Sequence, residues 1–289
     1  MNRQHYPGLY QAADEVSGDA QHYYLWTVRA YLLSLAASTA FALFSGTSTT
    51  AALVAAFLFL LSLGLALLLA LKRFEKTWYS ARAVAESVKT LTWRYIMRAT
   101  PYRDGGKKDP KCRFIRDLRE ILKENRDTTK ELCTESATTE AVTEEMERVR
   151  ALPLNERVQI YKTERVDEQH FWYNTKAIAN RRLHWIWFGV MIAFQIFALV
   201  CVLLRVAKPT WDKLPTDFLA VVAGAVLTWI QTKRYSELST SYSLTTHEIS
   251  MIAAQFTDFV SEESFSDFVG DSENAFSREH TQWIARRDA

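Results

Sequence analysis

Long apolar stretches with little or no charge recur along the chain and predict an all-α fold that crosses a membrane. One of them, 51–71, holds 21 residues without one charge. A helix of that length rises about 1.5 Å per residue and reaches roughly 30 Å, which matches the hydrocarbon core of a bilayer. Stretches at about 25–44, 183–204 and 216–231 predict three further spans. The pattern indicates a polytopic membrane protein with two tandem transmembrane helical hairpins.

The helical pattern continues beyond the second span. Residues 72–98 contain no Gly or Pro, so the sequence predicts one uninterrupted helix from 51 to 98. A 4-3-4-3 spacing from Phe74 to Tyr95 marks one packed face, and Trp93 and the charged residues are expected on the other side. The candidate assembly or ligand-contact residues are Trp78, Arg82, Glu86, Lys89, Trp93, Arg94 and Tyr95. Their charges would bind an anionic ligand or, as the favoured alternative, form ion pairs between helices or subunits.

Several helices are expected outside the membrane. Their ranges are 72–98, 110–126, 155–182, 232–260 and 273–287. Pro110 favours a helix start, and Asn155 is a candidate N-cap for the helix that leads into the third span. The Thr/Glu-rich segment 127–150 is either a solvated helix or a flexible linker, and we slightly favour the helix.

The distribution of charge predicts the orientation of the spans. The formal net charge is +2, but residues 72–126 carry 16 Lys and Arg against 7 Asp and Glu. The loop 45–50 carries no charge, so the positive-inside rule puts both ends of the first hairpin in the cytoplasm. The second hairpin has a weaker bias, because its outer loop holds Lys208 and Lys213. Both termini are therefore expected to be cytoplasmic.

Polar side chains form a stripe along the first span. Thr27, Tyr31, Ser34, Ser38 and Ser45 share one side of the expected helix. Ser34 and Ser38 make a small-xxx-small step, which permits close helix approach in lipid. The stripe is a candidate lining for a narrow lumen. The favoured alternative is that these two serines only permit close packing against the second span.

The chain repeats its own sequence around the two hairpins. A repeated interface motif precedes each hairpin: Gln21 and His22 in the first copy, Gln169 and His170 in the second. A Lys-Arg-aromatic motif follows each hairpin, at 72–74 and at 233–235. The matches indicate a parallel duplication. We expect the repeated histidines to pack at the membrane interface, with a pH-sensing role as the less favoured alternative.

Three segments resemble a known family. The sequence WYSARAVAESVKTLTWRY at 78–95 is similar to the signature of the SLATT superfamily, the SMODS- and SLOG-associating two-transmembrane effector domains. The segments ERVDEQHFWYNTKAIANRR at 164–182 and ENAFSREHTQW at 273–283 are similar to the arrangement in chains with two tandem modules. On this resemblance, residues 1–150 form a first SLATT-like module and residues 151–289 form a second.

The resemblance implies a non-enzymatic effector of a bacterial conflict or antiphage defence system in the inner membrane. Such an effector would oligomerise to form a pore or to perturb the membrane. Its implied partner is a soluble sensor or nucleotide-signalling protein. The alternative function is a membrane scaffold or receptor whose cytoplasmic helices recruit a soluble partner without conduction. Membrane lipid and further copies of the chain are the other expected partners, and nucleic acid is not expected.

No catalytic, cofactor-binding or metal-binding motif accompanies these features. The sequence lacks a GxxxxGK[ST] loop, a CxxC pair and an HExxH motif. Its three cysteines show no paired spacing, which is typical of a reducing compartment. A transporter or membrane enzyme is disfavoured, because the spans hold almost no charge and Gln195 is the strongly polar residue deep in the third. We therefore expect no enzymatic activity, no cofactor and no metal.

Overall fold

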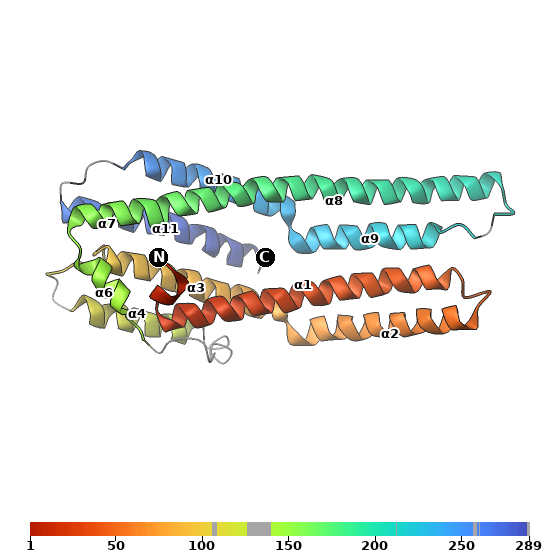
Figure 1. Ribbon diagram of the computed structural model, residues 1–289, viewed down its shortest axis with the longest axis horizontal. Helices are drawn as coiled ribbons and strands as arrows, with labels where there is room; N and C mark the ends of the chain where they lie inside the picture. The colour runs from red at the N-terminus through yellow and green to blue at the C-terminus, as the bar shows by residue number, and fades with distance from the viewer. Residues whose placement is uncertain (106–108, 126–139, 212, 257–258, 260, 288–289) are drawn as a thin grey trace. The chain divides into compact units, whose positions relative to one another are not determined.

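Helices form the secondary structure of this computed structural model, which describes residues 1–105, 109–125, 140–211, 213–256, 259 and 261–287 (Figure 1). No β-strand occurs in those ranges, so the all-α prediction is confirmed. The chain divides into two compact units. Unit 1 comprises Met1–Gln21, Glu75–Thr175 and Ser241–Ala289, and unit 2 comprises His22–Phe74 and Lys176–Thr240.

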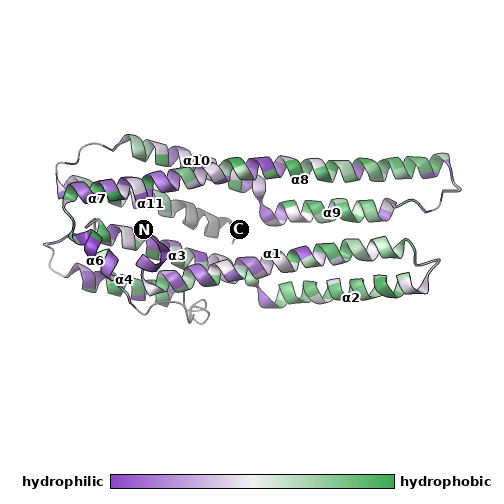
Figure 2. Ribbon diagram, viewed as in Figure 1, coloured by the Kyte–Doolittle hydropathy of each residue, from purple (hydrophilic) through white to green (hydrophobic). Residues whose placement is uncertain are grey.

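Unit 2 contains the four stretches that the sequence analysis assigns to spans. The first lies in α1 (Gly8–Ala42), which ends two residues before the predicted boundary, and the third lies in α8 (Glu168–Ala207). The second and fourth correspond to α2 (Thr49–Lys72) and α9 (Thr216–Lys233). Figure 2 shows α2, α9 and the adjoining parts of α1 and α8 as predominantly hydrophobic.

The outside of unit 2 is largely apolar. Within the described residues, the helical stretches Thr49–Ile96 and Leu154–Ala207 are long and apolar enough to cross a membrane by length and composition. Large side chains on them face outwards, such as Leu60 with 67% of its surface exposed and Phe197 with 63%. The small core of unit 2 is formed by Val28, Leu32, Trp229 and Tyr235.

The predicted uninterrupted helix over 51–98 is wrong at one residue. Arg73 separates α2 from α3 (Phe74–Ile96) and has a left-handed backbone, with φ 47° and ψ 39°. Arg234 separates α9 from α10 (Tyr235–Ala254) with φ 49° and ψ 38°. A left-handed conformation costs a non-glycine residue roughly 1–2 kcal/mol. Its recurrence at the equivalent arginine of each Lys-Arg-aromatic motif is a structural counterpart of the sequence repeat.

Unit 1 is a helical bundle with an aromatic core. Besides α3 and parts of α1, α8 and α10, it contains α4 (Pro110–Glu124), α6 (Glu144–Ala151), α7 (Leu154–Tyr161), a π-helical segment (Lys162–Asp167) and α11 (Glu262–Arg287). Tyr95 stacks on Phe114 with ring centres 4.8 Å apart. The fully buried aromatic residues are Trp93, Tyr95, Tyr102, Phe114, Tyr161 and Phe265.

Two predicted helix starts differ from the structure. Pro153 is the N-cap of α7, so Asn155 lies inside the first turn and the predicted cap is wrong. Helix α11 begins at Glu262, eleven residues before the predicted start at 273. Its added turns are stabilised because Phe265 and Val269 are both fully buried in the core of unit 1.

Other boundaries agree more closely. Pro110 starts α4 as predicted, and the Asp109 carboxylate caps it by accepting a hydrogen bond from the Lys111 amide at 3.1 Å. The predicted helix over 232–260 corresponds to α10, and residues 257, 258 and 260 lie outside the described residues. Of the segment 127–150, residues 144–150 belong to α6 and residues 127–139 lie outside the described residues.

Candidate functional site

A buried ion pair joins α11 to the π-helical segment inside unit 1. The Arg165 guanidinium donates to the Glu273 carboxylate twice, from Nε at 2.8 Å and from Nη2 at 2.7 Å. The side chains are only 3% and 0% exposed. The Tyr161 hydroxyl donates to the same carboxylate at 3.0 Å. Glu273 therefore accepts three hydrogen bonds away from water, and the opposite charge on Arg165 compensates its own.

Burial shifts the pKa values of the titratable side chains around this pair. Burial and the negative charge of Glu273 raise the pKa of Tyr161. Burial also raises the pKa of Tyr6, whose hydroxyl accepts a hydrogen bond from Trp93 Nε1 at 3.0 Å. Burial, with a contribution from the positive charge of Arg165, lowers the pKa of Lys89. Both tyrosines therefore remain neutral hydrogen-bonding groups across the physiological pH range.

The sequence analysis did not single out this pair. Val158, Tyr161 and Arg165 recur at helical spacing, so Arg165 occupies a position on an otherwise apolar face. A cation at such a position requires a partner. The partner is 108 residues away in the sequence, and no local pattern identifies Glu273 as that residue.

Further polar contacts hold α11 in unit 1. The fully buried Arg157 side chain pairs with Glu262 in the first turn of α11. Its Nη1 also donates to the Met97 carbonyl at 2.8 Å. Nearer the middle of α11, Arg103 pairs with Asp267. Helix α11 is thus attached by charged contacts as well as by its apolar face.

The first three predicted contact residues of α3 lie near the surface of unit 1. Trp78 is half-buried and stacks on Tyr79 with ring centres 4.6 Å apart. Arg82 forms ion pairs with Glu86 at 2.6 Å and with Asp14 of α1 at 3.6 Å. Arg82 and Glu86 therefore have partners within this chain, which favours ion pairing over an anionic ligand at this part of the helix.

The predicted position of Trp93 is wrong. Its side chain is fully buried, and its ring meets that of Tyr161 edge-on with centres 5.7 Å apart. The spacing argument assumed one packed face, but α3 is covered on this side as well. Arg94 donates to the Asn274 side chain at 2.7 Å, and Tyr95 is buried as its seam position predicts.

Lys89 is half-buried between these groups. Among the described residues, no hydrogen bond or ion pair to its ammonium is present. The Glu86 carboxylate acts in the opposite direction to the burial that lowers the pKa of Lys89. The structure thus brings the cations Arg82, Lys89 and Arg165 into one region of unit 1, together with Glu86 and Glu273.

The serines of the predicted stripe are buried inside unit 2. Ser34 is 6% exposed and Ser38 is 0% exposed. Their hydroxyls donate within α1, to the carbonyls of Tyr31 at 2.9 Å and Leu35 at 2.7 Å. Thr27 makes the same kind of bond to its own helix at 2.7 Å. These geometries favour the packing role for Ser34 and Ser38 over a water-lined lumen.

The remaining stripe and motif residues differ in their surroundings. Ser45 is exposed in the loop after α1, and Tyr31 is half-buried beside the core of unit 2. His22 is exposed, whereas His170 is half-buried with Nε2 lying 3.0 Å from the Ser250 hydroxyl of α10. The preceding glutamines of the repeated motif, Gln21 and Gln169, are both half-buried.

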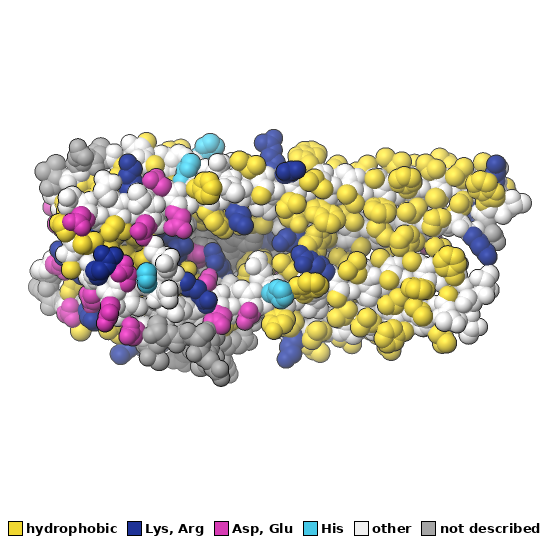
Figure 3. Space-filling view, viewed as in Figure 1, with side chains coloured by type: hydrophobic (Ala, Val, Ile, Leu, Met, Phe, Trp, Pro, Cys, Tyr) yellow, Lys and Arg dark blue, Asp and Glu magenta, His cyan; other side chains and the backbone are white. Residues whose placement is uncertain are grey.

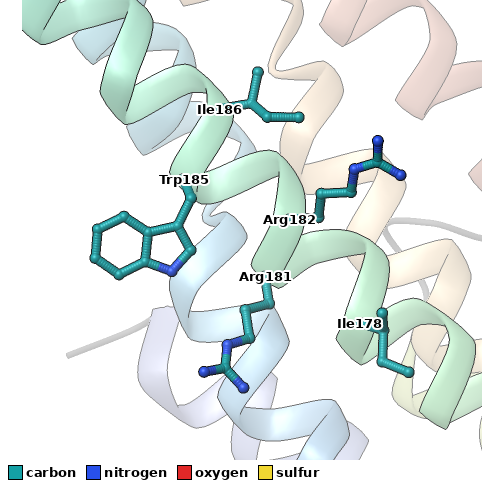
Figure 4. A pocket seen from close by; sticks show the side chains of 5 residues that line it. All are labelled: Ile178, Arg181, Arg182, Trp185 and Ile186. Atoms are coloured by element: carbon teal, nitrogen blue, oxygen red, sulfur yellow. The ribbon is translucent and has the colours of Figure 1, made fainter.

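Basic side chains gather where the apolar surface of unit 2 ends (Figure 3). The basic residues at this end of the four apolar stretches are Arg29, Lys72, Arg73, Lys176, Arg181, Arg182, Lys233 and Arg234. A shallow pocket of about 540 Å³ lies on α8 at this level. Figure 4 shows that Arg181, Arg182 and Trp185 line it together with Ile178 and Ile186.

Metal chemistry has no site in the part of the chain that the structure describes. No group of three or more His, Cys, Asp or Glu side chains there is arranged to hold an ion. Many charged groups of unit 1 pair with one another, such as Arg82 with Glu86 and Arg165 with Glu273, and those of unit 2 are almost all basic. The arrangement suits packing, assembly and contact with anionic groups.

Comparisons with known proteins identify both halves of the chain. Residues 7–158 match the family model described as SMODS and SLOG-associating 2TM effector domain 3. Residues 161–283 match the model described as SMODS and SLOG-associating 2TM effector domain 1. No curated protein and no solved structure matches the chain.

Proposed function

The chain belongs to the SMODS- and SLOG-associating two-transmembrane effector (SLATT) family, with two such domains in tandem, and on this premise we propose that it permeabilises a bacterial inner membrane. SLATT domains are two-transmembrane effector modules associated with conflict systems. The proposed role is that of a non-enzymatic effector in antiphage defence. A soluble sensor or nucleotide-signalling partner would switch it on.

The outward-facing apolar side chains of unit 2 support the membrane embedding on which this proposal rests. In a protein surrounded by water, a contiguous apolar surface of this extent would be a liability. Leu53, Leu60 and Leu63 of α2 each expose more than half of their surface. Transfer of such side chains from water into lipid is favourable by about 25 cal/mol for each Å² removed from water.

The proposed topology has four spans and two cytoplasmic termini. Helices α1 and α9 lack an 18-residue stretch as apolar as those in α2 and α8, but each is joined by a short connection to one of these two helices. The band of basic residues at one end of unit 2 supports a cytoplasmic location for that end. Unit 1, with its many ion pairs, would then lie in the cytoplasm.

Conduction would require several copies of the chain. The buried serines of α1 leave no wettable stripe for a lumen within one copy, so the proposed lumen forms between copies. Gln195 is exposed on α8 and is the polar side chain deep in that span. In an oligomer it is a candidate to line the lumen or to bond across helices.

A second candidate function rests on α10. Leu244 and Met251 of this helix are 59% and 65% exposed, although they belong to unit 1. The two residues are seven positions apart, so they lie on the same face of α10, which a partner protein would cover. The alternative is therefore a membrane scaffold that binds a soluble partner through α10 and does not conduct.

Ion flux separates the two functions. We expect the purified protein, reconstituted in liposomes with its activating partner where one is needed, to release an entrapped ion many times faster than protein-free liposomes. A fluorescent indicator inside the liposomes measures the rate, and flotation verifies incorporation. Incorporated protein that gives no flux above the protein-free level, with or without the partner, would contradict permeabilisation and favour the scaffold.

A further inference from the structure

Two basic side chains of unit 2 meet at one aromatic ring. The guanidinium carbon of Arg29 lies 4.9 Å from the centre of the Trp229 ring, and Lys233 Nζ lies 5.9 Å from the same centre. Arg29 belongs to α1 and Lys233 to α9, so the two cations come from different hairpins. Within the residues that the structure describes, neither cation forms an ion pair.

The charged side chains around the Trp229 ring are mostly positive. Burial lowers the pKa of Lys233, which follows the expected span 216–231, and the positive charges of Arg29 and Lys176 lower it further. Unit 2 contains eleven Lys and Arg residues but only three Asp and Glu residues. The acidic residue at this end of the spans is Glu237, which pairs with Arg234 at 3.0 Å.

Arg29 is exposed, but Lys233 is half-buried and Trp229 is buried, so the two cations repel one another at the edge of the interior of unit 2. The repulsion between like charges is larger there than in water, because the local dielectric constant is lower. A bound anion would offset this repulsion and raise the pKa of Lys233 back towards its ordinary value. The site therefore favours a negatively charged ligand that can reach both side chains at once.

The site lies at the edge of the apolar surface of unit 2. No charged residue occurs in α1 from 30 to 42 or in α9 from 218 to 232, so each cation ends an uncharged helical stretch. Arg29 also lies 5.6 Å from the ring of Trp26, which is 55% exposed. Tryptophan and basic side chains in this arrangement are typical of the headgroup layer of a membrane.

We propose that Arg29 and Lys233, held on the Trp229 ring, bind the phosphate of an anionic phospholipid headgroup. The inference rests on the proposed embedding of unit 2 in a membrane but not on conduction. Guanidinium and ammonium groups donate charge-assisted hydrogen bonds to phosphate oxygens. The ring keeps both cations close together through its negative face. A lipid bound there would join the two hairpins through its phosphate.

Lipid binding to the purified full-length protein tests the proposal. Native mass spectrometry from mild detergent counts bound phosphatidylglycerol, with phosphatidylcholine as the zwitterionic comparison. We expect Arg29→Gln with Lys233→Gln to weaken phosphatidylglycerol binding at least about tenfold, since each cation near a membrane surface is worth roughly fivefold in affinity. The matched control is Arg205→Gln with Lys213→Gln, which removes the same charge from exposed positions of unit 2 outside the basic band and should retain binding.

Several results would overturn the proposal. One is that the control variant loses as much phosphatidylglycerol binding as the Arg29 and Lys233 variant. Others are that the Arg29 and Lys233 variant binds phosphatidylglycerol as the native chain does, or that the native chain binds phosphatidylcholine equally well. Inorganic phosphate that displaces phosphatidylglycerol at similar concentration would assign the site to a free anion instead. The variant Arg29→Lys with Lys233→Arg keeps both charges and should retain affinity, and its loss in a folded protein would contradict the charge argument. Absence of the chain from the membrane fraction would instead refute the embedding.

Discussion

Glu273→Leu is expected to destabilise unit 1 by about 3–5 kcal/mol, because it leaves a buried guanidinium without its counter-charge. Arg165 cannot reach water from its present position, since its side chain is only 3% exposed. The Tyr161 hydroxyl loses its acceptor in the same substitution. Chemical denaturation in mild detergent, followed by circular dichroism, measures the change.

A double variant distinguishes the effect of the unpaired Arg165 charge from the effect of lost side-chain packing at position 273. Arg165→Met with Glu273→Leu removes both charges and should recover much of the lost stability, since a buried pair is worth little relative to apolar residues. Asp267→Ala is the matched control on α11, because its partner Arg103 is 37% exposed. That surface pair should cost at most about 1 kcal/mol. A double variant as unstable as Glu273→Leu would refute this account of the pair.

Leu227→Arg is expected to prevent α9 from crossing the membrane. Leu227 lies in the middle part of α9 and is 41% exposed. An arginine near the middle of a span costs about 3 kcal/mol, or roughly a hundredfold in the inserted fraction. Helix α9 has only 18 residues, so its remaining apolar side chains gain little free energy in lipid to offset that cost.

The position of the C-terminus reports this change. A reporter enzyme that is active only outside the inner membrane, fused after Ala289, should be inactive in the native chain and active in the Leu227→Arg variant. Leu244→Arg is the matched control, because Leu244 is 59% exposed on α10 of unit 1. It should leave the reporter inactive. If the reporter also stays inactive in the Leu227→Arg variant, the prediction that Leu227 of α9 faces the lipid of a membrane is wrong.

The sequence predicts the apolar helices well, because their signal is local. The span 51–71 differs from α2 by two residues at its start and one at its end, and the span 216–231 begins with α9 and ends two residues before it. Composition over one helix length is enough to identify such elements. Pro110 is another local signal, since a proline fits only the first turn of a helix.

The features that sequence analysis missed depend on tertiary structure. No Gly or Pro marks the helix break at Arg73, whose left-handed backbone is uncommon for a non-glycine residue. Trp93 was assigned to an outer face because spacing alone does not reveal how many sides of α3 are covered. The pair of Arg165 and Glu273 joins segments far apart in the chain, so its existence requires the folded bundle.

Accessibility of the loops in intact cells tests the central claim of two membrane-crossing hairpins most directly. In a chain without its native cysteines, Ser48→Cys and Lys208→Cys report on the two connections between spans, and native Cys112, exposed in unit 1, is restored alone as the third probe. An impermeant thiol reagent should label positions 48 and 208 in intact cells and Cys112 only after lysis. Labelling of Cys112 in intact cells, or protection of either loop position, would contradict the four-span topology.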